Sequence, residues 1–213
     1  IQYVHSFDGG HTFSGQQTLL TQEYALSTGL IAVSGPVVYV VCTAAIDTFS
    51  GTALLRSTDA GITWKPIRRL RPGTRPECLV ATESSVYLHF GNFRGTQYGF
   101  LSSIDSGATW SLRAVTMPHL DAMVVYSDML HGVGSVPAEF GGGHEVAYFY
   151  SVNSGASWAY SEVLSRDDVT PSVLPQLARN ERGHLFSVWN DAGVIVMRHS
   201  RDNGFSWLPQ VPL

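Results

Sequence analysis

The sequence predicts an all-β protein built from a repeated four-stranded unit, and three observations support this fold class. Five copies of a short turn motif recur at near-constant spacing along the chain. The segments between the motifs alternate apolar and polar residues, which is the pattern of β-strands. Of the 213 residues, 44% are hydrophobic and only 14% are charged, a balance that excludes disorder and disfavours a helical bundle.

The turn motif runs from a serine through an acid or amide and a glycine to a threonine or serine and an aromatic residue. Its acids or amide recur at intervals of 51, 46, 48 and 49 residues, and they are Asp8, Asp59, Asp105, Asn153 and Asp202. The glycines are Gly10, Gly61, Gly107, Gly155 and Gly204, and the aromatic residues are Phe13, Trp64, Trp110, Trp158 and Trp207. An Asp accepts hydrogen bonds from backbone N–H groups, a glycine adopts positive φ without steric cost, and an aromatic ring buries a large area. Since Asn153 keeps the acceptor oxygen but lacks the charge, we predict a structural role for all five motifs and no bound metal.

Strand patterns surround each motif in the same order. One strand precedes the motif, at 1–5, 52–56, 98–101, 145–150 and 194–198, and another follows it, as at 64–70, 110–115 and 158–164. Two more lie between motifs, at 30–33 and 37–42, 78–81 and 86–90, 122–126 and 129–133, and 173–178 and 184–189. We therefore predict one domain over residues 1–213, with a half unit at 1–20 and full units at about 28–70, 77–116, 121–164 and 172–213.

A unit of about 48 residues with four strands is typical of a β-propeller blade. The turn motif resembles the Asp box, or BNR repeat, of sialidases and several other propeller families, and the resemblance covers essentially the whole chain. It implies a sialidase-like β-propeller in which each box joins the third and fourth strands of a blade, at the end away from the ligand face. The same resemblance implies an extracytoplasmic or secreted protein. Such a motif identifies the fold better than the function.

The predicted strand count is incomplete for a propeller. Four full blades and a two-stranded half blade contain eighteen strands, whereas five blades need twenty. The chain is then an excerpt of a longer propeller, or a second chain completes it, or the N-terminal hairpin is a reduced blade. We favour the first explanation because Ile1 falls in the middle of a repeat.

Composition and spacing exclude several classes of function. With 13 basic and 17 acidic residues the net charge is −4, so no basic surface is expected for nucleic acid. No apolar stretch reaches the 18 or so residues of a membrane-spanning helix. The eight histidines show no metal-ligand spacing, and we predict neither a metal nor a cofactor. Cys42 and Cys78 lie in inner strands, where they act as small apolar residues or form one disulfide.

A ligand site is expected in the loops at the end of the strands opposite the boxes. These loops contain Arg71, Arg75, Glu77, Arg94, His119, Asp121, Glu139, His144, Arg166, Asp167, Asp168 and Asp191. We predict that the chain is a binding or assembly module that presents these loops to a protein or a glycan. Polar residues also accumulate in any exposed loop, so their presence alone does not define a site.

The alternative is an exo-glycosidase of the sialidase type, or a fragment of one, that hydrolyses a terminal acidic sugar. Under that hypothesis Arg71, Arg75 and Arg94 contact the sugar carboxylate, because guanidinium groups bind carboxylates bidentately. The candidate acids are Asp121, Asp168 and Asp191. The family's Arg-Ile-Pro signature is absent, and no Tyr and Glu pair matches the family's nucleophile. This departure is why we favour binding over hydrolysis.

Overall fold

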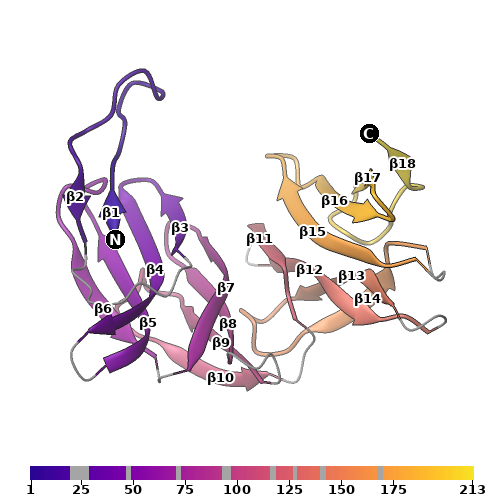
Figure 1. Cartoon of the computed structure of the whole chain (residues 1–213), viewed down its shortest axis with the longest axis horizontal. Coiled ribbons are helices and arrows are strands. Elements are labelled where there is room, and N and C mark those ends of the chain that lie inside the picture. The colour runs from indigo at the N-terminus through magenta and orange to yellow at the C-terminus, as the bar shows by residue number, and fades with distance from the viewer. Residues whose placement is uncertain are drawn as a thin grey trace. The chain divides into compact units, whose positions relative to one another are not determined.

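The computed structural model contains only β-strands as regular elements in the part of the chain that it describes (Figure 1). The described residues are 1–19, 29–46, 49–70, 73–92, 97–115, 119–126, 129–139, 143–166 and 170–213. Within these ranges no helix is long and apolar enough to cross a membrane. Contacts divide the chain into two compact units, Ile1–Pro76 and Glu77–Leu213. The predicted single domain and its blade limits stay predictions.

The first unit contains a two-stranded and a four-stranded antiparallel sheet. Strand β1 (Gln2–Tyr3) pairs with β2 (Gln17–Thr18), as a half blade does. The full sheet has the order β3-β4-β5-β6. Its strands are β3 (Gly29–Ser34), β4 (Val37–Ile46), β5 (Phe49–Ser57) and β6 (Lys65–Arg69).

The second unit contains three four-stranded sheets, each a simple meander. The first comprises β7 (Thr74–Ala81), which begins just before the unit boundary, β8 (Val86–Asn92), β9 (Tyr98–Ser103) and β10 (Ser111–Val115). The second comprises β11 (Ala122–Tyr126), β12 (Met129–Pro137), β13 (His144–Ser151) and β14 (Ala159–Val163). The third comprises β15 (Ser172–Arg179), β16 (Leu185–Asp191), β17 (Val194–Ser200) and the short β18 (Val211–Pro212). The predicted fold class, four full blades and a two-stranded half blade, is confirmed.

Each Asp box is a turn between the third and fourth strand of its blade, closed by local hydrogen bonds. In the second box Asp59 Oδ1 accepts from the Thr63 N–H at 2.8 Å and from the Ser57 hydroxyl at 2.7 Å. The Gly61 N–H donates to Ser57 Oγ at 2.8 Å. Ala60 and Gly61 both have positive φ, 57° and 90°, a conformation that a glycine adopts without cost.

The box acids owe their low pKa to these same hydrogen bonds. The Thr63 hydroxyl and N–H lower the pKa of Asp59 to about 2, and equivalent donors do so for Asp105 and Asp202. In the fourth box Asn153 Oδ1 accepts from the Ser157 N–H at 2.9 Å, and its amide donates to the Ser157 hydroxyl at 2.9 Å. The turn therefore needs an acceptor oxygen rather than a charge.

The apolar cores lie between successive blades within each unit. In the second unit one core packs β7–β10 against β11–β14 around Phe100, Leu120 and Phe149. Another packs β11–β14 against β15–β18 around Tyr148, Trp189 and Trp207. Cys42 and Cys78 are buried free thiols rather than a disulfide, and they donate to the carbonyls of Ala53 at 3.8 Å and Leu120 at 3.3 Å.

Candidate functional site

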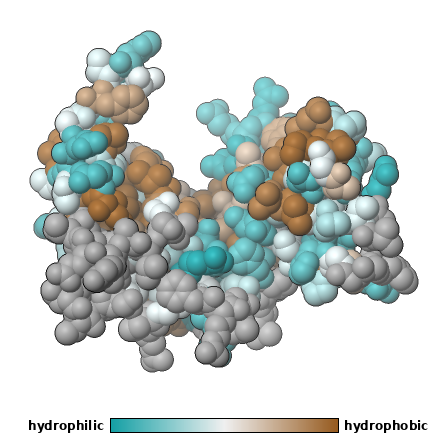
Figure 2. Space-filling model, in the orientation of Figure 1, coloured by the Kyte–Doolittle hydropathy of each residue, from teal (hydrophilic) through white to brown (hydrophobic). Residues whose placement is uncertain are grey.

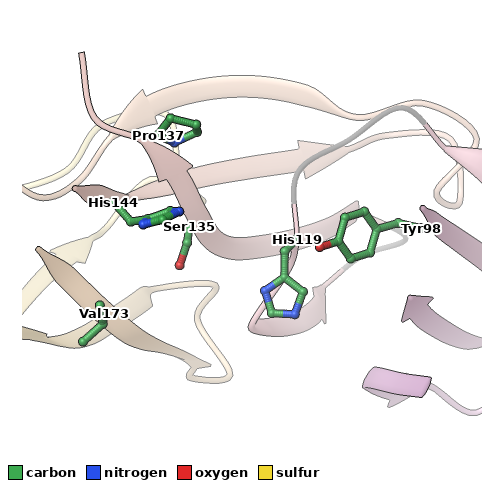
Figure 3. Close-up of a pocket in the computed structure, with 6 residues that line it drawn as sticks. All are labelled: Tyr98, His119, Ser135, Pro137, His144 and Val173. Carbon is green, nitrogen blue, oxygen red and sulfur yellow. The ribbon is translucent and has the colours of Figure 1, made fainter. Parts of the chain in front are cut away.

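A pocket opens on the second unit at the end of the strands opposite the Asp boxes (Figure 3). It has a volume of about 460 Å³ and is lined by Tyr98, His119, Ser135, Pro137, His144 and Val173. Tyr98 and His144 are the first residues of β9 and β13, whereas the boxes follow the last residues of these strands. The pocket therefore lies on the face where a ligand site was expected, and its size is that of a small-molecule site.

His119 lies between two carboxylates at the pocket wall. Its Nδ1 is 3.5 Å from Asp121 Oδ1, and its Nε2 is 3.3 Å from Glu77 Oε2. The contact of Nε2 with Glu77 is an ion pair whose geometry is not that of a well-aligned hydrogen bond. Asp121 and then Glu77 raise the pKa of His119 to about 9, and the imidazole is protonated at neutral pH.

Backbone packing holds this cluster in place. The Asp121 N–H donates to the Val133 carbonyl at 2.9 Å, which ties the start of β11 to β12. A Cβ on Gly134 would lie 1.9 Å from the His119 carbonyl oxygen, so only glycine permits this approach. The Ser135 hydroxyl then donates to Asp121 Oδ2 at 3.3 Å. The carboxylate of Asp121 is thus oriented by Ser135 and His119 together.

An aromatic group flanks the charged cluster. Tyr98 lies 5.7 Å from His119 between ring centroids and stacks on His89 at 5.4 Å with an interplanar angle of 20°. His89 is fully buried, and neither ring nitrogen has a hydrogen-bond partner in the described structure. Burial, and then the charge of His119, lowers the pKa of His89 to about 4. A neutral His89 therefore backs the Tyr98 ring.

Two further acids of this unit are engaged by neighbouring side chains. Glu145, next to His144, is buried and accepts a hydrogen bond from the Ser165 hydroxyl. Ser165 Oγ also accepts from the Val146 N–H at 2.9 Å. Asp191 accepts from the Ser172 hydroxyl at 3.1 Å and from Gln210 Nε2 at 2.7 Å. Both arrangements tie loops to strands rather than leaving a carboxylate open to a ligand.

The structure brings together only part of the predicted site. Asp121 lies beside His119 in the cluster at the pocket wall. Asp191 accepts hydrogen bonds from Ser172 and Gln210. Arg75 is an exposed residue of the first unit. Arg71, Arg94 and Asp168 lie outside the described residues.

Several pocket residues were not singled out by sequence reasoning. Glu77, His119 and His144 were members of the predicted loops without an assigned role, and Tyr98 and Ser135 were not predicted at all. Within the described ranges, no group of three or more possible ligand side chains can hold a metal ion.

Comparison with known proteins identifies the fold. Residues 55–66, which include the second box, match the BNR/Asp-box repeat. Among curated proteins, none matches this sequence. The chain has a β-propeller fold with Asp-box turns.

Solved structures of this fold resemble the chain at low sequence identity. A protein of unknown function from Dyadobacter fermentans DSM 18053 matches with a TM-score of 0.62 and 15% identity, over 86% of this chain and 68% of its own. Phage phi92 endosialidase matches with a TM-score of 0.61 and 10% identity, over 86% of this chain and 46% of its own. A point mutant of the NanB sialidase from Streptococcus pneumoniae matches with a TM-score of 0.55 and 16% identity, over 100% of this chain and 35% of its own. The propeller therefore spans less than half the length of either sialidase.

Proposed function

We propose that this propeller is a binding module whose pocket on the second unit takes a neutral glycan. The observation that carries the proposal is a polar cluster beside an aromatic ring, formed by His119, Asp121 and Tyr98. Sugar rings suit such sites because their C–H faces pack on aromatic rings. Their hydroxyls can donate to carboxylates and accept from an imidazolium.

The charges of the cluster favour binding over hydrolysis. Glycoside hydrolysis generally needs one protonated and one ionised carboxyl group at the scissile bond. Here His119, with a pKa of about 9, holds the proton between Glu77 and Asp121. Both acids contact the same imidazolium, so the cluster does not present the separate acid and base or nucleophile that this reaction uses.

The same charges favour a neutral sugar over an acidic one. Two carboxylates and one imidazolium give the cluster a net charge of −1. None of the residues that line the pocket in the described structure is an arginine or lysine. A sugar carboxylate would therefore meet repulsion unless cations from outside the described residues approach it.

A glycan array with neutral and sialylated oligosaccharides tests the proposal, followed by titration calorimetry on the strongest neutral ligand. Tyr98→Ala and Asp121→Asn are each expected to weaken binding at least tenfold, about 1.4 kcal/mol. Tyr160→Ala is the matched control, because Tyr160 is a 55% exposed tyrosine on β14 that does not line the pocket. Failure of every neutral glycan to bind, or equal affinity of all variants, would contradict the proposal. A protein partner at these loops stays a prediction.

The second candidate is a sialidase-type exo-glycosidase, which the shared fold with two sialidases favours. Its candidate residues remain Arg71, Arg75 and Arg94 for a sugar carboxylate, and Asp121, Asp168 and Asp191 as acids. Hydrolysis of a fluorogenic sialoside that is lost in Arg94→Ala would establish this activity in place of simple binding. Absence of turnover together with binding of a neutral glycan would exclude it.

A further inference from the structure

Ring contacts at the boxes of the second unit show which face of a sheet meets the next box. Phe100 on β9 packs against Trp158 in the box of the following blade, with ring centroids 5.6 Å apart. Tyr148 on β13 packs against Trp207 in the same way, at 5.2 Å. Each ring lies five residues before the acid or amide of its own box. The face of β7–β10 that carries Phe100 is therefore directed at the box of β11–β14.

A second pocket opens where this face meets that box. It has a volume of about 230 Å³, and its lining comes from the ends of β9 and β10, the box that joins them and the box between β13 and β14. In the register of β9 and β10, Ser102 pairs with Ser111. Arg113 lies two residues after Ser111 and pairs with Phe100, so all four side chains lie on one face of the sheet.

A serine is present at this pocket where the next pair of blades has a ring. Ser102 lies three residues before Asp105, and the residue three before Asn153 is Tyr150. Tyr150 packs against the core between β11–β14 and β15–β18, where its ring lies 6.3 Å from that of Tyr148. The smaller Ser102 leaves room for a pocket at the equivalent place and lines it with a hydroxyl.

The lining of this pocket is rich in hydrogen-bond donors. Arg113 is exposed and makes no ion pair with any residue that the structure describes. Asn153 donates one amide hydrogen to Ser157 Oγ at 2.9 Å, and a side-chain amide carries two. The other donors are the hydroxyl groups of Ser102, Ser111 and Ser154.

No acidic residue lines the pocket in the described part of the chain. Asp105 belongs to the adjoining box, and its carboxylate accepts from the Ser103 hydroxyl at 2.7 Å and from both the N–H and the hydroxyl of Thr109. The fourth box has Asn153 in the place of this acid, so an NH₂ group replaces the second carboxylate oxygen. A donor therefore faces the pocket where the other boxes have an acceptor.

The polar lining distinguishes this pocket, whereas exposed apolar residues do not. Ile104, which also lines it, is 67% exposed, but apolar side chains are exposed on both units (Figure 2). The volume of about 230 Å³ lies below the range of about 300–1,000 Å³ for sites of drug-sized ligands, so the pocket suits a single small group. A guanidinium surrounded by neutral donors favours an oxyanion.

We propose that this pocket binds a tetrahedral oxyanion, namely a sulfate or phosphate group. Arg113 supplies the positive charge, and the serine hydroxyls and the Asn153 amide supply further hydrogen bonds. These donors come from two strands and a neighbouring turn, which suits an anion that accepts at oxygens on several sides. The site lies at the box end of β9, whereas Tyr98 of the first pocket lies at the other end, so this proposal is independent of glycan binding there.

NMR titration with sodium sulfate, and separately with sodium phosphate, tests the proposal at constant ionic strength. The Arg113 Nε–H and the Asn153 side-chain amide report binding at this pocket alone, and both are expected to shift and saturate. Galactose 6-sulfate, with galactose as its neutral counterpart, distinguishes the source of the group. Tighter binding of galactose 6-sulfate than of sulfate assigns the site to a sulfated sugar, and equal affinity assigns it to the free anion.

Asn153→Asp is the most specific variant, because it restores the acid of the other four boxes and so preserves the turn. It is expected to weaken sulfate binding at least about tenfold through like-charge repulsion, with no loss in Tm. Arg113→Gln should weaken binding to a similar degree. Arg182→Gln is the matched control, because Arg182 is an exposed arginine between β15 and β16 that does not line the pocket.

Two results would overturn the proposal. One is that neither sulfate nor phosphate produces a saturable shift of the Arg113 and Asn153 side-chain resonances. The other is that Asn153→Asp binds sulfate as tightly as wild type and Arg182→Gln do.

Discussion

Alanine substitution of a box glycine tests the blade-to-blade contact directly, and the last blade supplies its own control. Gly204 has φ +87° and lies under the Tyr148 ring, where a Cβ would approach Oη to 2.1 Å. Gly193, in the turn between β16 and β17, has φ +90° and no atom within 4 Å of a Cβ. The two positions therefore share backbone strain and differ in the steric clash.

The expected magnitudes follow from these two terms. The left-handed conformation costs an L-residue about 1–2 kcal/mol, and this applies to both Gly193→Ala and Gly204→Ala. Tyr148 is fully buried and its hydroxyl lies 2.6 Å from His131 Nδ1, so the ring cannot move aside freely. Overpacking of this kind costs about 1–3 kcal/mol more in Gly204→Ala.

Thermal unfolding followed by circular dichroism measures the difference. For a chain of this size each kcal/mol lowers Tm by about 2–4 °C. Gly204→Ala is therefore expected to melt about 2–12 °C below Gly193→Ala, which itself melts below wild type. Equal melting temperatures for the two variants would show that the Tyr148 ring does not constrain the box.

Three further predictions concern titratable groups. Asp202→Asn is expected to lower the urea midpoint less than Asp202→Ala, because an amide oxygen still accepts the Ser206 N–H bond seen for Asp202 at 2.9 Å. The pKa of Asp202 is lowered from 3.8 to about 2, so wild type loses stability as pH falls through this range, and Asp202→Asn should lose less. The pKa of His119 is raised from 6.5 to about 9, so its protonated form stabilises the fold below pH 6.5 and this contribution disappears as pH rises to about 9. The Tm of His119→Gln should therefore change less with pH than that of wild type between pH 6.5 and 9. The pKa of His89 is lowered to about 4, so as pH falls from 6.5 the unfolded chain takes up a proton at this residue before the folded chain does, and the fold loses stability. The Tm of His89→Phe should therefore fall less than that of wild type between pH 6.5 and 4.

The fold was predictable because its determinants are local and repeated. Every box contains its own hydrogen-bond partners within a few residues, so the spacing of Asp8, Asp59, Asp105, Asn153 and Asp202 was enough to place the turns. Strands lie where the alternating pattern predicts them, but their limits differ: β1 pairs only over Gln2–Tyr3 where 1–5 was predicted, and β12 runs over Met129–Pro137 where 129–133 was predicted.

The site was less predictable because its contacts join different blades. Glu77 belongs to β7 and His119 to the segment before β11, and they meet only because the two blades pack together. Tyr98 carries no motif, and its ring is stacked on the buried His89, which the sequence pattern does not reveal. Loop composition indicated the face on which the pocket opens, but it could not indicate which side chains converge there.

The two ends of the same strands are held by different kinds of contact. At the box end, Asp105 is held by Ser103 and Thr109 of its own turn, and this arrangement needs no ligand. At the pocket end, His119 depends on Glu77 from the neighbouring blade, so its position reports how the two blades pack. A substitution such as Tyr98→Ala is expected to change binding with little effect on the box turns, whereas a substitution at Gly204 changes the blade spacing. Ligand affinity should consequently respond to box variants only when the packing between blades is altered. The ring contacts at the boxes and the pocket are linked because Tyr148 and His144 lie on the same strand, β13.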